Sequence, residues 1–234
     1  MSIYLSGGGE PPLADFVADA ARSSARRDAT VPRIAVIYTG RHYRKTRPDE
    51  IVDALTAAGE CEPVVLEYGV SQEAALADLI DIDALYVSGG DPREYLRALQ
   101  PVLGEIRRRV AEGTPYFGTS AGALIAAEKA LVAGYSIGGI AVAPPTISDA
   151  ESELEIAEGI GLVDITIEVH AAQWGTVSRL IAATEASLVT GGVAIDEDTA
   201  LVVTDGGLNV VGGGSIWQVI PGEHGVTVAT AAAS

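Results

Sequence analysis

Segments with the character of strands alternate with segments that favour helices through the first half of the chain, and this order constrains the fold most strongly. Residues 33–39, Arg-Ile-Ala-Val-Ile-Tyr-Thr, form a nearly continuous apolar run, which is typical of a strand buried on both faces. Further strands are predicted over residues 3–6, 62–67, 84–88 and 114–117, and helices over 13–27, 49–58, 72–79, 93–99, 102–112 and 123–130. The β-α-β-α order predicts an α/β fold with a mainly parallel sheet and helices on both faces.

The second half of the chain has a different character. Residues 134–161 contain glycines, a Pro-Pro pair and an acidic run, which predict a long loop with one short helix, either a lid over a site or a surface excursion. Strands are expected over 165–169 and 200–203, a helix over 174–183, a hairpin turn at 205–207, and small antiparallel strands over 215–220 and 226–229 that close the sheet edge. The Ala-rich C-terminus is expected to fray. No boundary divides the sequence, which predicts a single domain over residues 1–234.

Composition narrows the class of protein. The 234 residues carry a formal net charge of −17, which repels nucleic acid and anionic membranes. The single cysteine, Cys61, cannot form an internal disulfide, and no apolar run approaches the roughly 20 residues of a membrane helix. Residues 1–9 predict a strand and a glycine loop rather than a secretory signal. We therefore expect a cytoplasmic protein that binds neither nucleic acid nor membrane, and the spacing of His and Cys predicts no metal site.

The motif Gly-Thr-Ser-Ala-Gly at residues 118–122 is the main candidate for chemistry. It fits G-x-S-x-G, the nucleophile elbow, in which a sharp turn from a strand into a helix exposes a serine hydroxyl. An apolar strand segment precedes it and a helix-forming segment follows it, and the flanking glycines relieve the crowding of such a turn. Ser120 is therefore the candidate nucleophile, and it needs a general base and an orienting acid.

His170 is the best placed of the three histidines to act as the base. It ends the strand predicted over 165–169, so it is expected at the carboxyl edge of the sheet, where ligands of such folds gather and where Ser120 should lie. His42 lies in a charged loop, and His224 follows Pro-Gly in a predicted surface turn. The alternative interpretation of His170 is a hydrogen-bonded histidine at a strand end without a catalytic role.

The orienting acid is sought in the segment Ala-Ile-Asp-Glu-Asp-Thr-Ala-Leu-Val-Val at residues 194–203. Glu197 is the central carboxylate, while Asp196 and Asp198 are alternatives that the spacing does not exclude. A solvated acidic turn is the alternative without a catalytic role. The order serine, histidine, acid differs from the serine, acid, histidine order of α/β-hydrolases and argues against that fold.

An oxyanion needs backbone N–H groups that point at the developing negative charge. Ala121, directly after the serine, is expected to supply one such group. Gly90 is expected to supply another from a neighbouring strand end, because glycine permits close approach of the backbone. The alternative for Gly90 is a tight turn after a strand, with no role in binding.

Five segments carry a resemblance to a known family. They are Ile-Tyr-Leu-Ser-Gly-Gly-Gly at 3–9, Tyr-Val-Ser-Gly-Gly-Asp at 86–91, Gly-Thr-Ser-Ala-Gly-Ala at 118–123, His170 with Gln173, Gly175, Arg179 and Leu180, and Ile-Asp-Glu-Asp-Thr-Ala-Leu-Val-Val at 195–203. Over nearly its whole length the chain resembles the serine peptidases that include dipeptidase E (aspartyl dipeptidase) and cyanophycinase, and the last segment is closer to the cyanophycinase branch. The resemblance implies a three-layer α/β fold like that of class I glutamine amidotransferases (flavodoxin-like), with Glu197 as the third member of the triad.

The chain departs from the cyanophycinase pattern at positions that hold the β-aspartyl-arginine unit in those enzymes. Asp-Gln before the histidine, arginines at the fourth and sixth places after it, and the glutamine after Gly-Gly-Asp are replaced by Glu168, Val169, Trp174, Thr176 and Pro92. Arg179, at the ninth place, is retained. Tryptophan and threonine cannot reproduce the bidentate grip of an arginine on a carboxylate, so cyanophycin is not the expected substrate.

Candidates for contact with substrate follow from the resemblance and from the distribution of charge. They are Asp91, Gln173, Trp174, Arg179, Arg41 and Arg44. The last two belong to the basic run at residues 41–47, which follows a predicted strand and so begins at the same sheet edge. The hypothesis is that Arg41, Arg44 or Arg179 pairs with an acidic side chain of the substrate, against the alternative of a solvated charged loop. Trp174 either walls the pocket or packs in the core.

These features together predict a serine-type exopeptidase or dipeptidase that hydrolyses short peptides without a cofactor and favours an acidic N-terminal residue such as aspartate. The alternatives are a β-aspartyl isopeptidase similar to cyanophycinase, and a catalytically silent family member that binds a small ligand. A homodimer is the expected assembly.

Overall fold

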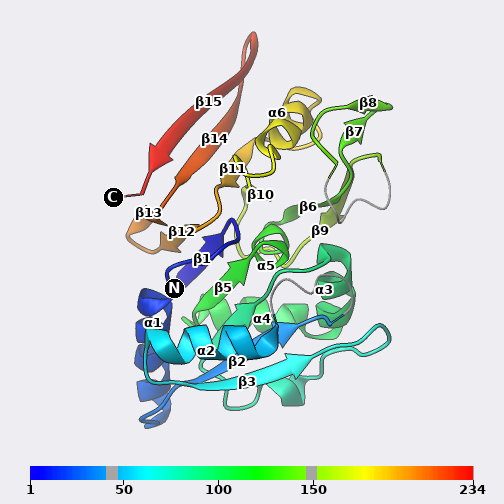
Figure 1. Cartoon of the computed structure of the whole chain (residues 1–234). Helices are drawn as coiled ribbons and strands as arrows, with labels where there is room; N and C mark the ends of the chain where they lie inside the picture. The colour runs from blue at the N-terminus through cyan, green and yellow to red at the C-terminus, as the bar shows by residue number, and fades with distance from the viewer. Residues whose placement is uncertain (41–46, 146–151, 234) are drawn as a thin grey trace.

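The computed structural model describes residues 1–40, 47–145 and 152–233. At their centre these residues form a seven-stranded sheet with the strand order β13-β12-β1-β5-β4-β2-β3 (Figure 1). The strands are β1 (Ser2–Ser6), β2 (Arg33–Tyr38), β3 (Glu62–Glu67), β4 (Ala84–Val87), β5 (Tyr116–Thr119), β12 (Thr199–Thr204) and β13 (Gly207–Gly212). β1 to β5 run parallel, whereas β12 pairs antiparallel with β1 and β13 with β12. The predicted α/β fold with a mainly parallel sheet is confirmed.

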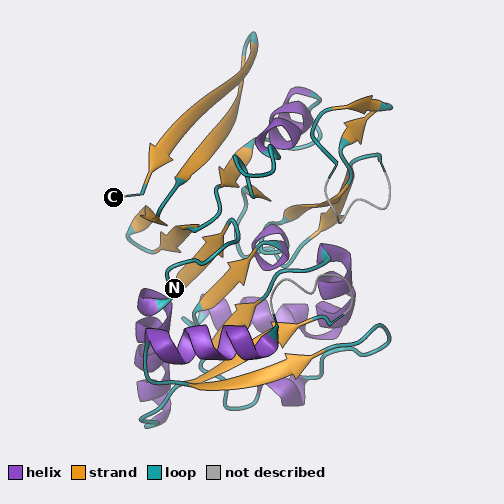
Figure 2. Ribbon diagram, viewed as in Figure 1, coloured by secondary structure: helices purple, strands orange, loops and turns teal. Residues whose placement is uncertain are grey.

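Helices cover both faces of this sheet (Figure 2). One face carries α1 (Ala14–Ser24), which continues into the 3₁₀ turn η1 (Ala25–Arg27), and α2 (Pro48–Ala58). The other face carries α3 (Pro92–Leu99), the 3₁₀ turn η3 (Gln100–Val102), α4 (Leu103–Ala111) and the short α5 (Ala121–Leu124). The likeness to class I glutamine amidotransferases stays a prediction.

Alternation along the strands explains how both faces are buried. Successive strand side chains point to opposite faces, so Ile3 and Leu5 of β1 enter the core under α3, α4 and α5, while Tyr4 enters the core under α1 and α2. In that second core Phe117 of β5 lies between the rings of Tyr4 and Tyr86, with ring centroids 5.8 and 5.3 Å away. These side chains bind the middle strands to the helical layer of α1 and α2.

A second sheet of the described residues contains β10 (Thr166–Val169), β11 (Gly192–Ile195), β14 (Ser215–Gly222) and β15 (Gly225–Ala232). β10 and β11 are parallel and the other neighbours are antiparallel, and α6 (Val177–Glu185) packs against this sheet through Leu180 and Ala183. Only residues 196–198 separate β11 from β12 of the central sheet. This short link therefore joins the two sheets. The β14-β15 hairpin extends away from the central sheet, and β15 is an edge strand of the second sheet (Figure 1).

The second sheet corrects two predictions. Strand 165–169 and the C-terminal strands do not belong to the central sheet, because β10 and β14 pair with β11 instead. The prediction of a frayed C-terminus is wrong as far as Ala232, whose backbone pairs with Ser215 across the β14-β15 ladder. Ladder hydrogen bonds that satisfy the backbone groups hold this tail in place.

The helix predicted over 123–130 is also wrong. α5 ends at Leu124, and Lys129 begins β6 (Lys129–Ala133), which pairs with β9 (Glu155–Glu158). The backbone between them bonds to a distant segment instead: Ile160 N–H donates to Ile125 O, at 2.6 Å, and Glu128 N–H donates to Val163 O, at 2.9 Å. Tertiary pairing thus overrides a run of strong helix formers.

Two further segments differ from the helices predicted for them. Over 72–79 the structure has only the 3₁₀ turn η2 (Leu76–Leu79), because Ala75 is extended and the Asp78 carboxylate accepts its N–H. Residues 134–161 contain no helix in their described part, where β7 (Ser136–Ile137), β8 (Ile140–Ala141) and β9 lie; residues 146–151 fall outside the described ranges.

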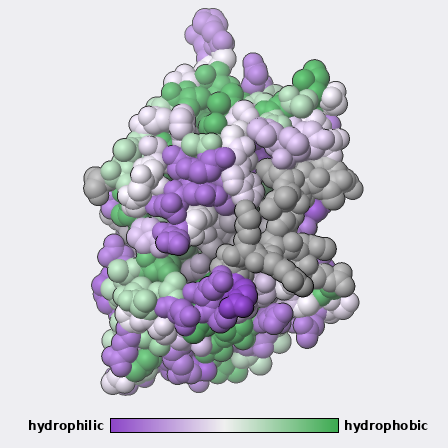
Figure 3. Space-filling view, in the orientation of Figure 1, coloured by the Kyte–Doolittle hydropathy of each residue, from purple (hydrophilic) through white to green (hydrophobic). Residues whose placement is uncertain are grey.

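The surface shows hydrophilic and hydrophobic residues interspersed over the face seen in Figure 3. In the ranges that the structure describes, no helix is both long and apolar enough to cross a membrane.

Phe117 provides a test of the core. Because its ring is fully buried between Tyr4 and Tyr86, Phe117→Ala should lower the free energy of unfolding by about 3–5 kcal/mol through lost burial and a cavity. Urea unfolding followed by circular dichroism measures the change. The exposed Leu208 serves as control, since Leu208→Ala should shift the free energy by no more than about 0.5 kcal/mol. Equal costs for the two variants would contradict this packing.

Candidate active site

Ser120 occupies a tight turn between β5 and α5. Its backbone has φ 51° and ψ −113°, outside the ordinary regions for a non-glycine residue. The neighbouring glycines make the turn sterically feasible: a Cβ on Gly118 would lie 2.3 Å from Gly122 O, and one on Gly122 would lie 2.2 Å from Val87 O. The strand, the helix and β4 therefore approach one another as a nucleophile elbow requires.

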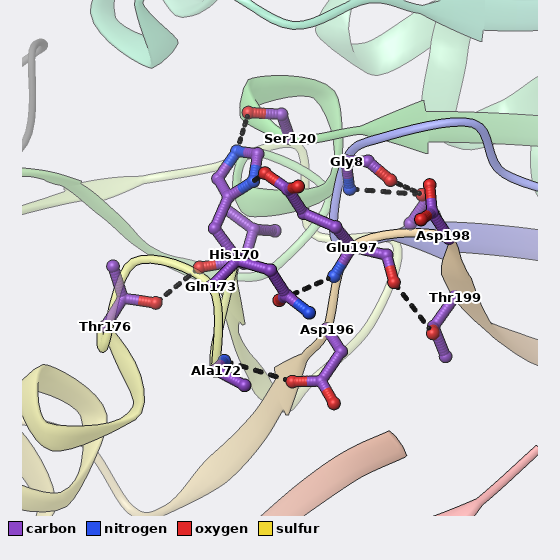
Figure 4. A network of polar contacts seen from close by, with 12 residues as sticks. Gly8, Ser120, His170, Ala172, Gln173, Thr176, Asp196, Glu197, Asp198 and Thr199 are labelled. Atoms are coloured by element: carbon purple, nitrogen blue, oxygen red, sulfur yellow. Dashed lines mark hydrogen bonds and ion pairs between the residues drawn. The ribbon is translucent and has the colours of Figure 1, made fainter. Parts of the chain in front are cut away.

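His170 reaches Ser120 from the second sheet. Its Nε2 lies 2.9 Å from the Ser120 Oγ, within hydrogen-bond distance (Figure 4). The histidine follows the last residue of β10, has a left-handed φ of 55°, and donates its backbone N–H to Gly7 O at 3.0 Å. The expected meeting of Ser120 and His170 at strand ends is therefore present, although the two residues come from different sheets.

Glu197 lies on the other side of the imidazole. Its Oε1 is 2.8 Å from His170 Nδ1, and the side chains are 28% and 9% exposed, respectively. The backbone of Glu197 is held by Gln173, whose Oε1 accepts the Glu197 N–H at 3.0 Å (Figure 4). Serine, imidazole and carboxylate thus form one chain of hydrogen bonds, an arrangement that can move a proton from a serine hydroxyl to an imidazole.

The two aspartates beside Glu197 make other contacts. Asp196 is buried and accepts from the N–H groups of Ala172 and Ser215 and from Trp217 Nε1, at 2.9–3.0 Å. Asp198 accepts the N–H of Glu10. The spacing along the chain did not distinguish among these three carboxylates as the orienting acid. Of the three, the structure places only Glu197 against the imidazole.

Of the remaining histidines, the structure describes His224, which is not part of this arrangement. His224 lies in the exposed turn between β14 and β15, and His42 lies outside the described residues.

Gly8 is a further residue of the site. Its φ is +111°, and a Cβ at this position would lie 2.3 Å from His170 Cε1, so the imidazole occupies the space that any other residue would fill. Asp198 N–H donates to Gly8 O at 2.9 Å, which ties the same loop to the link that carries Glu197. The run of three glycines marked this loop in the sequence, but its contact with His170 depends on tertiary packing.

Trp174 stacks on His170. The ring centroids are 3.9 Å apart with an interplanar angle of 10°, and the Trp174 backbone N–H donates to His170 O at 2.9 Å. Trp174 lines both cavities that border Ser120 and His170 and is half-buried, so it is a wall residue rather than a buried core residue.

Gly90 and Ala121 lie beside Ser120 and border the same small pocket. Gly90 has φ +155°, and a Cβ there would lie 3.1 Å from Tyr95 Cε2. Tyr95 supports this loop, since its hydroxyl donates to Gly89 O at 3.0 Å and burial raises the pKa of the phenol to about 12. The phenol therefore remains a neutral hydrogen-bond donor at physiological pH.

Of the charged residues predicted to contact substrate, the structure describes two, Asp91 and Arg179, and each is paired with another side chain. Asp91 caps α3 by accepting Arg93 N–H at 2.9 Å, and its carboxylate pairs with the Arg93 guanidinium. Arg179 is buried and forms a bidentate pair with Glu168, at 2.7 and 2.8 Å, and its Nη1 donates to Gly134 O at 3.0 Å. Arg41 and Arg44 lie outside the described residues.

Two cavities border Ser120 and His170. A cleft of about 680 Å³ also touches Gly8, Glu197 and residues of α2. A much smaller pocket, of about 30 Å³, lies toward α5, β6 and α6. Both cavities include Gly90 and Trp174 in their walls.

No group of three or more His, Cys, Asp or Glu side chains within the described ranges is arranged to hold a metal ion.

The site combines a candidate nucleophile, Ser120, a candidate base, His170, and a candidate acid, Glu197, with the backbone of Gly90 and Ala121 beside the serine. Groups of these kinds can perform acyl transfer.

Comparison with known proteins agrees with this chemistry. The sequence model of a family described as peptidase family S51 matches residues 3–211. Proteins named cyanophycinase from Synechococcus elongatus and Trichormus variabilis are 35% and 34% identical, over 67% and 63% of this chain. The matches cover 47% and 48% of those proteins, so the chain spans about half the length of the curated relatives it matches.

Two solved structures share the fold. One is a peptidase from an acI-B1 actinobacterium, with a TM-score of 0.67 at 20% identity, covering 100% of this chain and 94% of that one. Another is described as a putative peptidase E from Listeria monocytogenes EGD-e, with a TM-score of 0.57 at 17% identity, covering 90% and 98%.

Gly8→Ala tests the packing of the imidazole. Because the added methyl group would overlap His170 Cε1, the ring must move, and covalent labelling of Ser120 by a fluorophosphonate should slow by about tenfold or more. Intact-protein mass spectrometry measures the labelling rate. The control is Gly213→Ala, where an added Cβ meets nothing within 4 Å. Equal labelling rates for the two variants would contradict this role of Gly8.

Proposed function

Because the chain belongs to peptidase family S51, we propose that it is a serine peptidase that hydrolyses short peptides with Ser120, His170 and Glu197. The observation that carries the proposal is the chain of hydrogen bonds from Ser120 Oγ to His170 Nε2, at 2.9 Å, and from His170 Nδ1 to Glu197 Oε1, at 2.8 Å. Each residue is in reach of the group on which it must act before any substrate is bound.

In the proposed reaction the Ser120 oxygen attacks the scissile carbonyl carbon while His170 takes the hydroxyl proton. The carbonyl oxygen becomes negatively charged, and the N–H groups of Gly90 and Ala121 stabilise it. His170 then gives its proton to the leaving amine, which departs and leaves an acyl group on Ser120. Water, deprotonated by the same imidazole, then attacks the acyl carbon. The bond between that carbon and Ser120 Oγ breaks as the imidazolium returns its proton to Oγ, which releases the acid product.

Glu197 fixes the imidazole in this scheme. A carboxylate that accepts from Nδ1 leaves Nε2 as the acceptor for the serine proton, and it stabilises the imidazolium that forms. The Gln173 bond to the Glu197 backbone keeps the carboxylate in place. Trp174 presents its ring to the imidazole and shields it from water.

More specifically, we propose that the protein acts on short peptides as an exopeptidase or dipeptidase. A preference for an acidic N-terminal residue required an arginine available to the substrate. Of the three candidate arginines, the one that the structure describes, Arg179, already binds Glu168.

A second candidate is hydrolysis of β-aspartyl linkages, favoured by the relatives named cyanophycinase. The wall of the site at Trp174 and Thr176 differs from the arginines of that pattern, which favours ordinary peptides. A panel of α- and β-linked dipeptides distinguishes the two, since turnover of β-linked substrates alone would support the second candidate.

Substitution of the triad tests the proposed function directly. Ser120→Ala removes the nucleophile and His170→Ala removes the base, so each should lower kcat/KM on short peptides by roughly 10⁴-fold or more. Glu197→Gln leaves the imidazole without its orienting carboxylate and should lower kcat/KM by roughly 10²–10⁴-fold. Peptide cleavage is followed by mass spectrometry of the products.

Ser71→Ala, at an exposed serine outside the site, is the matched control and should retain full activity. Thermal unfolding monitored by circular dichroism establishes that each variant is folded. Undiminished cleavage by the folded Ser120→Ala variant would refute the proposal.

A further inference from the structure

We infer that the small pocket beside Ser120 selects a small, uncharged side chain on the residue that supplies the scissile carbonyl, such as glycine, alanine or serine. This inference rests on the proposed function and names the class of substrate that the site takes.

The position of the pocket identifies the part of the substrate that enters it. The scissile carbonyl must lie against Ser120 Oγ, with its oxygen toward the N–H groups of Gly90 and Ala121. The side chain of the same residue is attached one carbon away, so it must enter a space next to these groups. The small pocket borders Ser120, Gly90 and Ala121, whereas Ala121 is not part of the larger cleft. The larger cleft then holds the rest of the peptide.

The size of the pocket limits the side chain. Its volume of about 30 Å³ leaves room for only a few non-hydrogen atoms, since a cavity needs roughly 10–15 Å³ to hold one water molecule. Its apolar walls, Leu124, Val132 and Val169, are almost fully buried in a close-packed interior, so they cannot move apart without loss of packing. A methyl or hydroxymethyl group fits this space, and the side chain of leucine or phenylalanine does not.

The charge of the pocket wall disfavours acidic side chains. Arg179 is the cation in the wall, and the buried Glu168 carboxylate neutralises it through two hydrogen bonds. Glu168 is itself held, because its Oε1 accepts the Val169 N–H at 3.0 Å. A substrate carboxylate would add a second negative charge beside the fully buried Glu168, which is costly because a buried charge loses its hydration. The pair thus makes the pocket neutral, which opposes the hypothesis of an acidic preference through Arg179.

A panel of dipeptides tests the inference. In peptides of the form Xaa-Leu, kcat/KM for Gly, Ala and Ser at the first position should exceed that for Asp, Lys, Leu and Phe by about tenfold or more. Equal or faster cleavage of the Asp or Leu peptide would overturn the inference while leaving the peptidase proposal intact. Failure to cleave any peptide, together with no Ser120-dependent fluorophosphonate labelling, would overturn both.

Enlarging the pocket provides a second test. Val132→Ala and Leu124→Ala should each raise the ratio of kcat/KM for Val-Leu over Ala-Leu by about tenfold, because the wall recedes by the volume that the larger substrate needs. The matched control for Val132→Ala is Val110→Ala in α4, which removes the same atoms from a similarly buried position outside the pocket and should leave the ratio unchanged. An unchanged ratio in a folded Val132→Ala or Leu124→Ala variant would overturn the inference.

Neutralising Glu168 provides a third test, specific to charge. Glu168→Gln keeps the size of the side chain but leaves Arg179 with a positive charge that a substrate carboxylate can neutralise. The ratio of kcat/KM for Asp-Leu over Ala-Leu should rise by about tenfold or more in this variant. An unchanged ratio would show that the Glu168–Arg179 pair does not set the preference, and would overturn this part of the inference.

Discussion

The hydrogen bond between Ser120 and His170 depends on the contact between two sheets. Ser120 follows a strand of the central sheet, and His170 follows a strand of the second sheet. The Gly7–Gly9 loop holds the two together, since His170 N–H donates to Gly7 O and Asp198 N–H donates to Gly8 O. Glu197 lies in the link that connects the sheets, two residues after β11, the strand beside β10. A change in the relative position of the sheets would therefore separate base and acid from the nucleophile.

The backbone at the site is unusual in a way that fits this function. Ser120, His170 and Asp198 all have left-handed φ values, of 51°, 55° and 56°, which cost free energy for residues other than glycine. Each of the three lies directly after or before a strand and is held by a backbone hydrogen bond to residues 6–8. Ser120 N–H donates to Ser6 O, His170 N–H to Gly7 O, and Asp198 N–H to Gly8 O, and the His170 bond joins the second sheet to the central one. The surrounding sheets therefore impose the conformations that the site requires.

The sequence predicted correctly those elements whose conformation depends mainly on residues close to them in the chain. The apolar run at 33–39 gave β2, buried on both faces, and the elbow at 118–122 gave the turn between β5 and α5. The prediction over 123–130 failed because backbone groups after Leu124 pair with residues 160–163, a contact that helix propensity does not reveal. Residues 165–169 form a strand, but the expectation that it ends at the edge of the central sheet was wrong, because β10 pairs with β11 in the second sheet.

The sequence by itself determined the nucleophile turn, the order serine, histidine, acid, and the membership in a peptidase family, because these depend on residue identity at fixed spacing. The tertiary structure alone decided which of three carboxylates faces His170, and that Arg179 is engaged by Glu168 rather than presented as an unneutralised cation. His170 and Glu197 follow the neighbouring strands β10 and β11, and Arg179 of α6 lies against Glu168 of β10. Spacing along one chain does not encode which strands are neighbours or which helix face packs on them, so it does not encode these contacts.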